Sequence, residues 1–120
     1  MEDRPPNRKP MAKVQTLEER KRARVEEIRA GFARLREELV DYGRAHGGKF
    51  WVYGSAVTDR LRFDSDIDIL ADFGDADRVA ALDFVESACA RLGLRCDVQP
   101  KAWCSPAFIA RIAANALILP

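Results

Sequence analysis

The sequence predicts one small α/β domain in which a small sheet is flanked by helices, in the order α-β-α-β-α-β-α. Short apolar and β-branched runs at residues 49–53, 67–71 and 94–98 alternate with longer segments of helical periodicity. A chain of 120 residues, 48% hydrophobic and 32% charged, fits a single globular domain rather than a disordered or fibrous protein. No internal repeat or linker divides it.

Residues 1–15 hold three of the six prolines and almost no large apolar residue, which predicts a disordered N-terminal arm followed by a domain over residues 16–120. Thr16 and Glu19 form a capping-box pattern at the start of a long helix that runs to Tyr42 or slightly beyond. Its first half is charged on nearly all sides. One apolar stripe marks the face that covers the sheet: Val25, Ile28, Phe32, Leu35, Leu39 and Tyr42.

The later elements follow from similar local signals. Residues 56–61 are expected to form a short helix after the first strand, and Asp75 or Asp77 caps the helix that ends at Gly93. Ser105 followed by a proline opens a last helix, whose apolar face is predicted to include Leu117.

Composition excludes several classes of protein. The N-terminus lacks the apolar segment of a secretory signal, and no stretch approaches the roughly 20 apolar residues of a membrane span, so we expect a cytoplasmic protein. Residues 31–120 carry eleven basic against thirteen acidic side chains, which argues against direct nucleic-acid binding. Cys89, Cys96 and Cys104 have no C-x-x-C spacing, so we predict reduced core thiols rather than a disulfide or zinc site.

The segment from Gly54 to Asp68 carries the chemistry. Gly54 and Ser55 directly follow a strand. The glycine backbone, which carries no side chain, and the serine hydroxyl can together hold phosphate oxygens. Asp66 and Asp68 are predicted to point to the same face of the second strand, and Asp97 is a lone carboxylate in the apolar third strand. Such carboxylates suit Mg²⁺ or Mn²⁺, and three of them can seat two cations for nucleotidyl transfer.

The spaced G-S and D-x-D, with the later aspartate, resembles the minimal nucleotidyltransferases of the DNA polymerase β superfamily, above all the small MNT-domain antitoxins that pair with HEPN toxins. The resemblance covers residues 30–120 and includes the ending R-I-A-A-N-A-L-I-L, similar to that family's last helix and strand stub. It implies a polymerase β-like fold with a mixed sheet, and transfer of AMP from ATP to a toxin tyrosine. It also implies metal ligation by Asp66, Asp68 and Asp97, with β- and γ-phosphates held by Gly54 and Ser55.

One departure from the family pattern concerns its usual G-S-x-A-R-G. This chain has Thr58 and Asp59 at the Arg and Gly positions, which leaves Arg60 and Arg62 as candidates for the missing positive charge. A binding module that has lost activity and masks its partner by contact is therefore the main alternative. Transfer to a small molecule ranks lower, because an acceptor-binding domain is not evident after the last strand.

Overall fold

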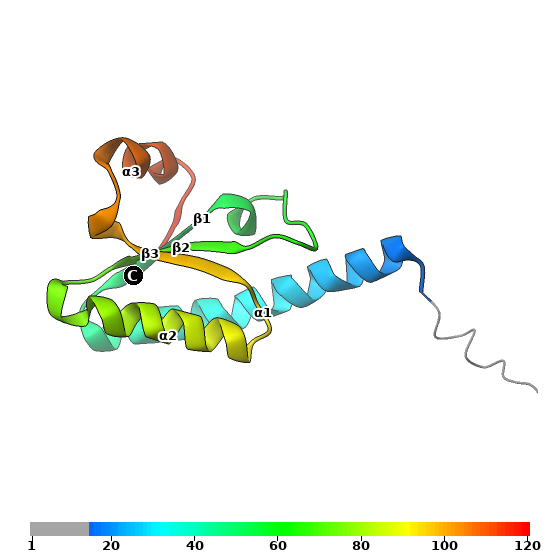
Figure 1. Cartoon of the computed structure of the whole chain (residues 1–120), viewed down its shortest axis with the longest axis horizontal. Helices are drawn as coiled ribbons and strands as arrows, with labels where there is room; N and C mark the ends of the chain where they lie inside the picture. The colour runs from blue at the N-terminus through cyan, green and yellow to red at the C-terminus, as the bar shows by residue number, and fades with distance from the viewer. Residues whose placement is uncertain (1–14) are drawn as a thin grey trace, which may run out of the picture.

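Residues 15–120 are described by the computed structural model, in which three helices pack against a four-stranded sheet (Figure 1). The predicted disordered arm lies almost wholly outside the described residues. The helices are α1 (Leu17–His46), α2 (Arg78–Arg91) and α3 (Pro106–Ala113). The strands are β1 (Lys49–Tyr53), β2 (Ile67–Asp72), β3 (Cys96–Pro100) and β4 (Leu117–Leu119). The predicted class, a small mixed sheet flanked by helices, is confirmed.

The sheet has the order β3-β2-β1-β4. β1 pairs antiparallel with both β2 and β4, whereas β2 and β3 are parallel. Parallel neighbours need a crossover, and α2 provides it. The register aligns Asp68 with Tyr53 on one side and with Asp97 on the other, so one row of the sheet carries all three residues.

The core lies between the sheet and the two longer helices. α1 and α2 cover one face, while α3 and the turn after β1 lie on the other face (Figure 1). Ile67 and Ile69 on β2 are fully buried, as their alternation with Asp68 predicts. They join a cluster that includes Leu35 and Leu39 of α1 and other buried side chains: Phe50, Val52, Val85 and Leu119.

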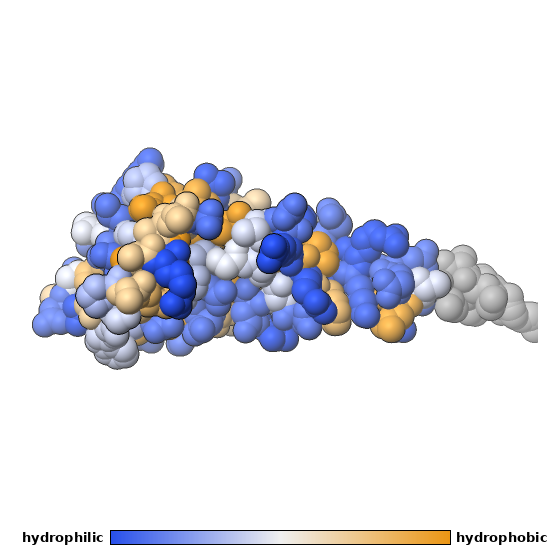
Figure 2. Space-filling model, turned by 90° about the horizontal axis from the view of Figure 1, so that it is seen from above, coloured by the Kyte–Doolittle hydropathy of each residue, from blue (hydrophilic) through white to orange (hydrophobic). Residues whose placement is uncertain are grey.

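Local capping signals set the ends of α1. The Thr16 hydroxyl accepts from the Glu19 amide at 3.0 Å, and the Glu19 carboxylate accepts from the Thr16 amide at 2.8 Å, which confirms the capping box. The helix continues beyond Tyr42 and ends at Gly47, whose φ of +71° favours glycine. Burial begins only at Ile28, and Figure 2 shows mostly hydrophilic side chains along the projecting half.

Two expectations about element order are wrong. Residues 56–61 do not form a helix; the chain makes a single 3-10 turn at Gly54–Val57 and then an irregular segment. Leu117 does not extend α3 but begins β4, which hydrogen-bonds to the otherwise open edge of β1 and so satisfies backbone groups there. The order therefore ends with a strand, as the resemblance of the C-terminal residues implied.

The prediction of three reduced cysteines is also wrong. Cys89, near the end of α2, forms a disulfide with Cys96, the first residue of β3. Gly93, with a φ of +70°, turns the chain back under the helix and brings the two sulfurs together. Cys104 is a free thiol. Within residues 15–120, the structure contains no helix long and apolar enough to cross a membrane.

Candidate active site

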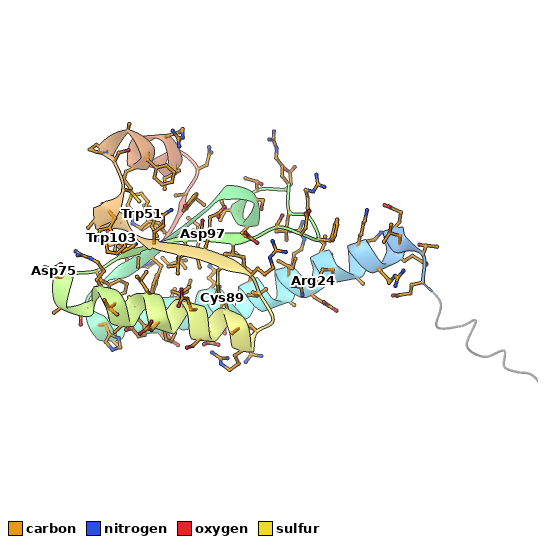
Figure 3. The ribbon with its side chains drawn as sticks, viewed as in Figure 1. Arg24, Trp51, Asp75, Cys89, Asp97 and Trp103 are labelled. Carbon is orange, nitrogen blue, oxygen red and sulfur yellow. A yellow bond between two sulfur atoms is a disulfide. The ribbon has the colours of Figure 1, made fainter. Side chains whose placement is uncertain are left out.

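Asp68 and Asp97 form a carboxylate pair on the face of the sheet away from α1 and α2. They are register partners on the parallel strands β2 and β3, and side chains of aligned residues lie on the same face. Figure 3 shows Asp97 on the side of β3 opposite α2, which carries Cys89. Asp97 therefore lies on the same face of the sheet as Asp68. Nucleotidyl transfer requires the two carboxylates to share a face.

The environment of Asp68 disfavours its charge. Its side chain is half-buried, and this burial raises the pKa of the carboxyl above its ordinary value. The negative charges of Asp97 and then of Asp66 raise the pKa further. Because like charges repel across the two strands, a cation placed beside the pair would relieve an unfavourable interaction.

Asp66 is held differently from the other two aspartates. It lies just before β2 rather than within it and is exposed. Its Oδ1 accepts from Arg95 Nε at 2.9 Å and lies 2.8 Å from Arg95 Nη2. Over residues 15–120, no three or more His, Cys, Asp or Glu side chains form a group able to hold a metal ion. The structure thus shows Asp68 and Asp97 as a carboxylate pair, with Asp66 ion-paired to Arg95 nearby. The catalytic and metal-binding roles of the three aspartates stay predictions.

Gly54 brings the turn after β1 close to Asp68. Its φ is +78°, and a Cβ built there would overlap Asp68 Oδ2. No other residue type fits both the backbone conformation and the close approach. The turn is closed by Thr58, whose backbone amide and hydroxyl both donate to the Ser55 carbonyl at 3.2 Å. Thr58 therefore has a structural task at the position where the resembling family has arginine.

Tyr53 is a site residue that the sequence did not single out. It lies opposite Asp68 in the sheet, and burial raises the pKa of its hydroxyl, with further contributions from the charges of Asp68 and Asp97. Its ring packs edge-on against Phe108 of α3, with centroids 5.7 Å apart. Its place immediately before Gly54 was the available signal, but a strand tyrosine next to a turn is more often structural.

A pocket of about 650 Å³ opens beside the Gly54–Val57 turn, on the side towards α3. Arg60 lines it, whereas Arg62 pairs with Asp64 at 3.4 Å, so only the first of the two candidate arginines faces this space. From α3 and the residues after it, Arg111 and Asn115 contribute. The remaining lining residues are Tyr53, Gly54, Ser55, Thr58, Asp59 and Ile112. Nothing in the sequence linked α3 to the turn.

The donor set fits a hard divalent cation. Asp68 and Asp97 offer only oxygen, which Mg²⁺ and Mn²⁺ prefer, and the charge repulsion at Asp68 favours a bound cation. Asp66 would become a third oxygen donor only by leaving its ion pair with Arg95. Asp68 and Asp97 would hold the cation, and Gly54 would leave space beside it.

Comparison with known proteins identifies the family of the chain. Residues 32–119 match the family model described as a nucleotidyltransferase domain. No curated protein and no solved structure matches the chain. The family match covers β1 to β4, the glycine-serine turn and all three aspartates, and it extends over well more than half of the sequence. The chain therefore belongs to the nucleotidyltransferase domain family.

Proposed function

We propose that this chain is a metal-dependent nucleotidyltransferase that moves AMP from ATP onto a hydroxyl of a partner protein, and that the partner is a HEPN-type toxin which it neutralises as an antitoxin. The observation that carries the proposal is the contact of Gly54 with Asp68, beside Asp97. It combines a carboxylate pair with a turn that the resembling family uses for phosphates. The family match supports nucleotidyl transfer in general.

The reaction assigns a task to each residue of the site. The acceptor oxygen bonds to the α-phosphorus while the bond from that phosphorus to the pyrophosphate oxygen breaks. Asp97, the more exposed carboxylate of the pair, would accept the proton of the acceptor hydroxyl. Gly54 and Ser55 would hold the β- and γ-phosphates that leave together. A divalent cation held by Asp68 and Asp97 would neutralise part of the phosphate charge. It would also lower the pKa of the attacking hydroxyl.

A large acceptor suits the surroundings of the carboxylates. Asp97 is exposed, and Trp103, in the turn after β3, has 72% of its surface exposed. Figure 3 shows Trp103 in that turn and Asp97 towards the other end of β3. Exposed tryptophans are frequent anchors in protein interfaces. A protein that docks along β3 could contact Trp103 and present a hydroxyl to Asp97 without an enclosed acceptor pocket.

The test uses ATP labelled on either the α- or the γ-phosphate, with the co-purified partner and Mg²⁺ or Mn²⁺. We expect label on the partner from α-labelled ATP only, and none with Asp97→Asn. Asp83→Asn, an exposed carboxylate on α2, is the matched control and should transfer as the wild type does. Transfer of the γ-label would indicate a kinase, and absence of transfer from either label would remove the enzymatic proposal.

The second candidate function is a binding module that neutralises the partner by contact alone. Two observations favour it: Asp66 is paired with Arg95, and Thr58 closes the turn where the family has arginine. Its signature is neutralisation that survives the double variant Asp68→Asn with Asp97→Asn. If neutralisation is lost in that variant while partner binding persists, the enzymatic proposal holds.

A further inference from the structure

We infer that Arg111 of α3, together with Arg60, binds the phosphate tail of the nucleotide in the pocket between α3 and the Gly54–Val57 turn. The inference rests on the proposed function and adds a second element to it. α3 thereby supplies the positive charge that the sequence lacks at position 58, and the α3 segment becomes part of the substrate site rather than a cover for the sheet.

The pocket has the shape for this ligand. Its volume of about 650 Å³ lies within the usual range for small-molecule sites. Gly54 and Ser55 of the turn line it, and so does Arg111 of α3. In Figure 1, α3 and the turn lie on the same side of the sheet. A ligand held by the turn is therefore also within the space that Arg111 borders.

The two arginines are available for an anion. Among the ion pairs of residues 15–120, Arg62 is paired with Asp64 and Arg95 with Asp66, but neither Arg60 nor Arg111 has an acidic partner. Asp59 lines the same pocket, so the lining side chains carry two positive charges and one negative charge. A guanidinium can donate two parallel hydrogen bonds to a phosphate, which makes arginine well suited to this position.

Arg111 is also held in place. Its guanidinium carbon lies 5.2 Å from the centre of the Phe108 ring, and Phe108 packs edge-on against Tyr53. This stack connects the α3 arginine to the strand that leads into the turn. A stacked arginine loses less conformational freedom when it binds an anion than a fully mobile one.

The order of groups along the site matches the order of phosphates. Tyr53 is aligned with Asp68 and also lines the pocket, so the pocket begins where the carboxylate row ends. With the α-phosphate at Asp68 and Asp97, the β- and γ-phosphates extend past Gly54 towards Arg60 and Arg111. AMP lacks those two phosphates and does not reach the arginines, which gives the inference a specific test.

The experiment measures the Kd values of ATP, AMP and inorganic tripolyphosphate for the full chain in Mg²⁺. Arg111→Ala should weaken ATP and tripolyphosphate binding about tenfold and leave AMP binding unchanged, because only the outer phosphates lose a charged partner. Arg111→Lys should recover part of the loss. Arg44→Ala, exposed at the end of α1, is the matched control and should behave as the wild type. Arg111 is exposed, and an unchanged melting temperature of each variant confirms folding.

Two other outcomes would overturn the inference. Unchanged ATP binding in Arg111→Ala would show that α3 does not reach the phosphates. Equal weakening of AMP and ATP would place Arg111 on the nucleoside. Both leave the proposed function intact if the wild type prefers ATP to AMP. A wild type that binds neither ATP nor tripolyphosphate would instead count against the proposed function itself.

Discussion

At the scale of single residues, the site depends on one glycine and on negatively charged carboxylates that repel each other. Gly54 combines a positive φ with contact to Asp68, and the charge of Asp68 is opposed by burial and by Asp97. Asp66 is ion-paired with Arg95, and its charge contributes less than that of Asp97 to the raised pKa of Asp68. The site is thus arranged around a negative charge that a metal-free protein tolerates only at a cost in stability.

Replacement of Gly54 by alanine should lower the free energy of unfolding by about 1–3 kcal/mol, because the side chain meets Asp68 and the backbone conformation is unfavourable for alanine. Gly74→Ala is the matched control: its φ is −67°, an added Cβ meets nothing within 4 Å, and the change should stay within about 0.5 kcal/mol. Urea unfolding measures both. Equal effects of the two substitutions would contradict the close contact at Gly54.

Asp68→Asn should stabilise the metal-free protein at pH 7. The pKa of Asp68 is raised in the folded state above its unfolded value of about 3.9, so its cost is absent below that pH and grows as the pH rises through the folded pKa. The stability gain of the variant should therefore be near zero around pH 3 and largest near neutrality. Urea unfolding in EDTA at several pH values measures it, with Asp83→Asn as control. A gain that does not change with pH would refute this assignment.

At the scale of secondary-structure elements, local signals predicted the starts of α1 and α3 and the end of α2. Thr16, Ser105 and Gly93 act as caps where the sequence placed them, because capping depends on residues only a few positions apart. Contacts between distant elements were not predictable in this way. The pairing of β4 with β1 and the Cys89–Cys96 link both depend on how the chain returns in space.

The candidate site also combines features that nearby residues predict with features that depend on contacts between distant elements. The sequence indicated Asp68, Asp97 and Gly54, because strand alternation and spacing are local properties. It did not indicate Arg95 as the partner of Asp66, and it did not indicate Arg111, which comes from α3. Both arginines reach their positions through tertiary packing, for which the sequence offers no periodic signal.

The disulfide joins α2 to the strand that carries Asp97, so its loss should loosen this connection. Reduction of the wild type, or the double variant Cys89→Ala with Cys96→Ala, should lower the free energy of unfolding by about 2 kcal/mol, as expected for a short loop. The double variant should show no further response to reductant. Cys104→Ala should keep the full response. A wild type whose unfolding is the same with and without reductant would contradict a stabilising disulfide.

At the scale of the whole molecule, the fold separates a packed body from a projecting helix. The body consists of the sheet, α2, α3 and the second half of α1, and α1 contributes buried side chains only from Ile28 onward. Arg24 is the first residue of α1 seen to hydrogen-bond to the body, through the Gly93 carbonyl at 2.8 Å. The segment before it adds length but little burial.

Deletion of residues 1–20 should therefore change the free energy of unfolding of the body by less than about 1 kcal/mol, the scale of a lost helix cap. Leu35→Ala, at a fully buried position in the same helix, should cost about 2–5 kcal/mol. Thermal and urea unfolding measure both variants. A truncated chain that fails to fold would show that the projecting half belongs to the cooperative unit.

The location of a divalent cation tests the central claim most directly. At 13.5 kDa the chain suits NMR, in which Mn²⁺ broadens the amide signals of nearby residues. Low Mn²⁺ should first broaden the signals of Gly54, Ser55, Asp68 and Asp97, and Asp68→Asn with Asp97→Asn should abolish this selective effect. Broadening that begins instead at the exposed acidic turn of Asp75 and Asp77, and is unchanged in the double variant, would contradict a metal-dependent site at the β2–β3 carboxylate pair.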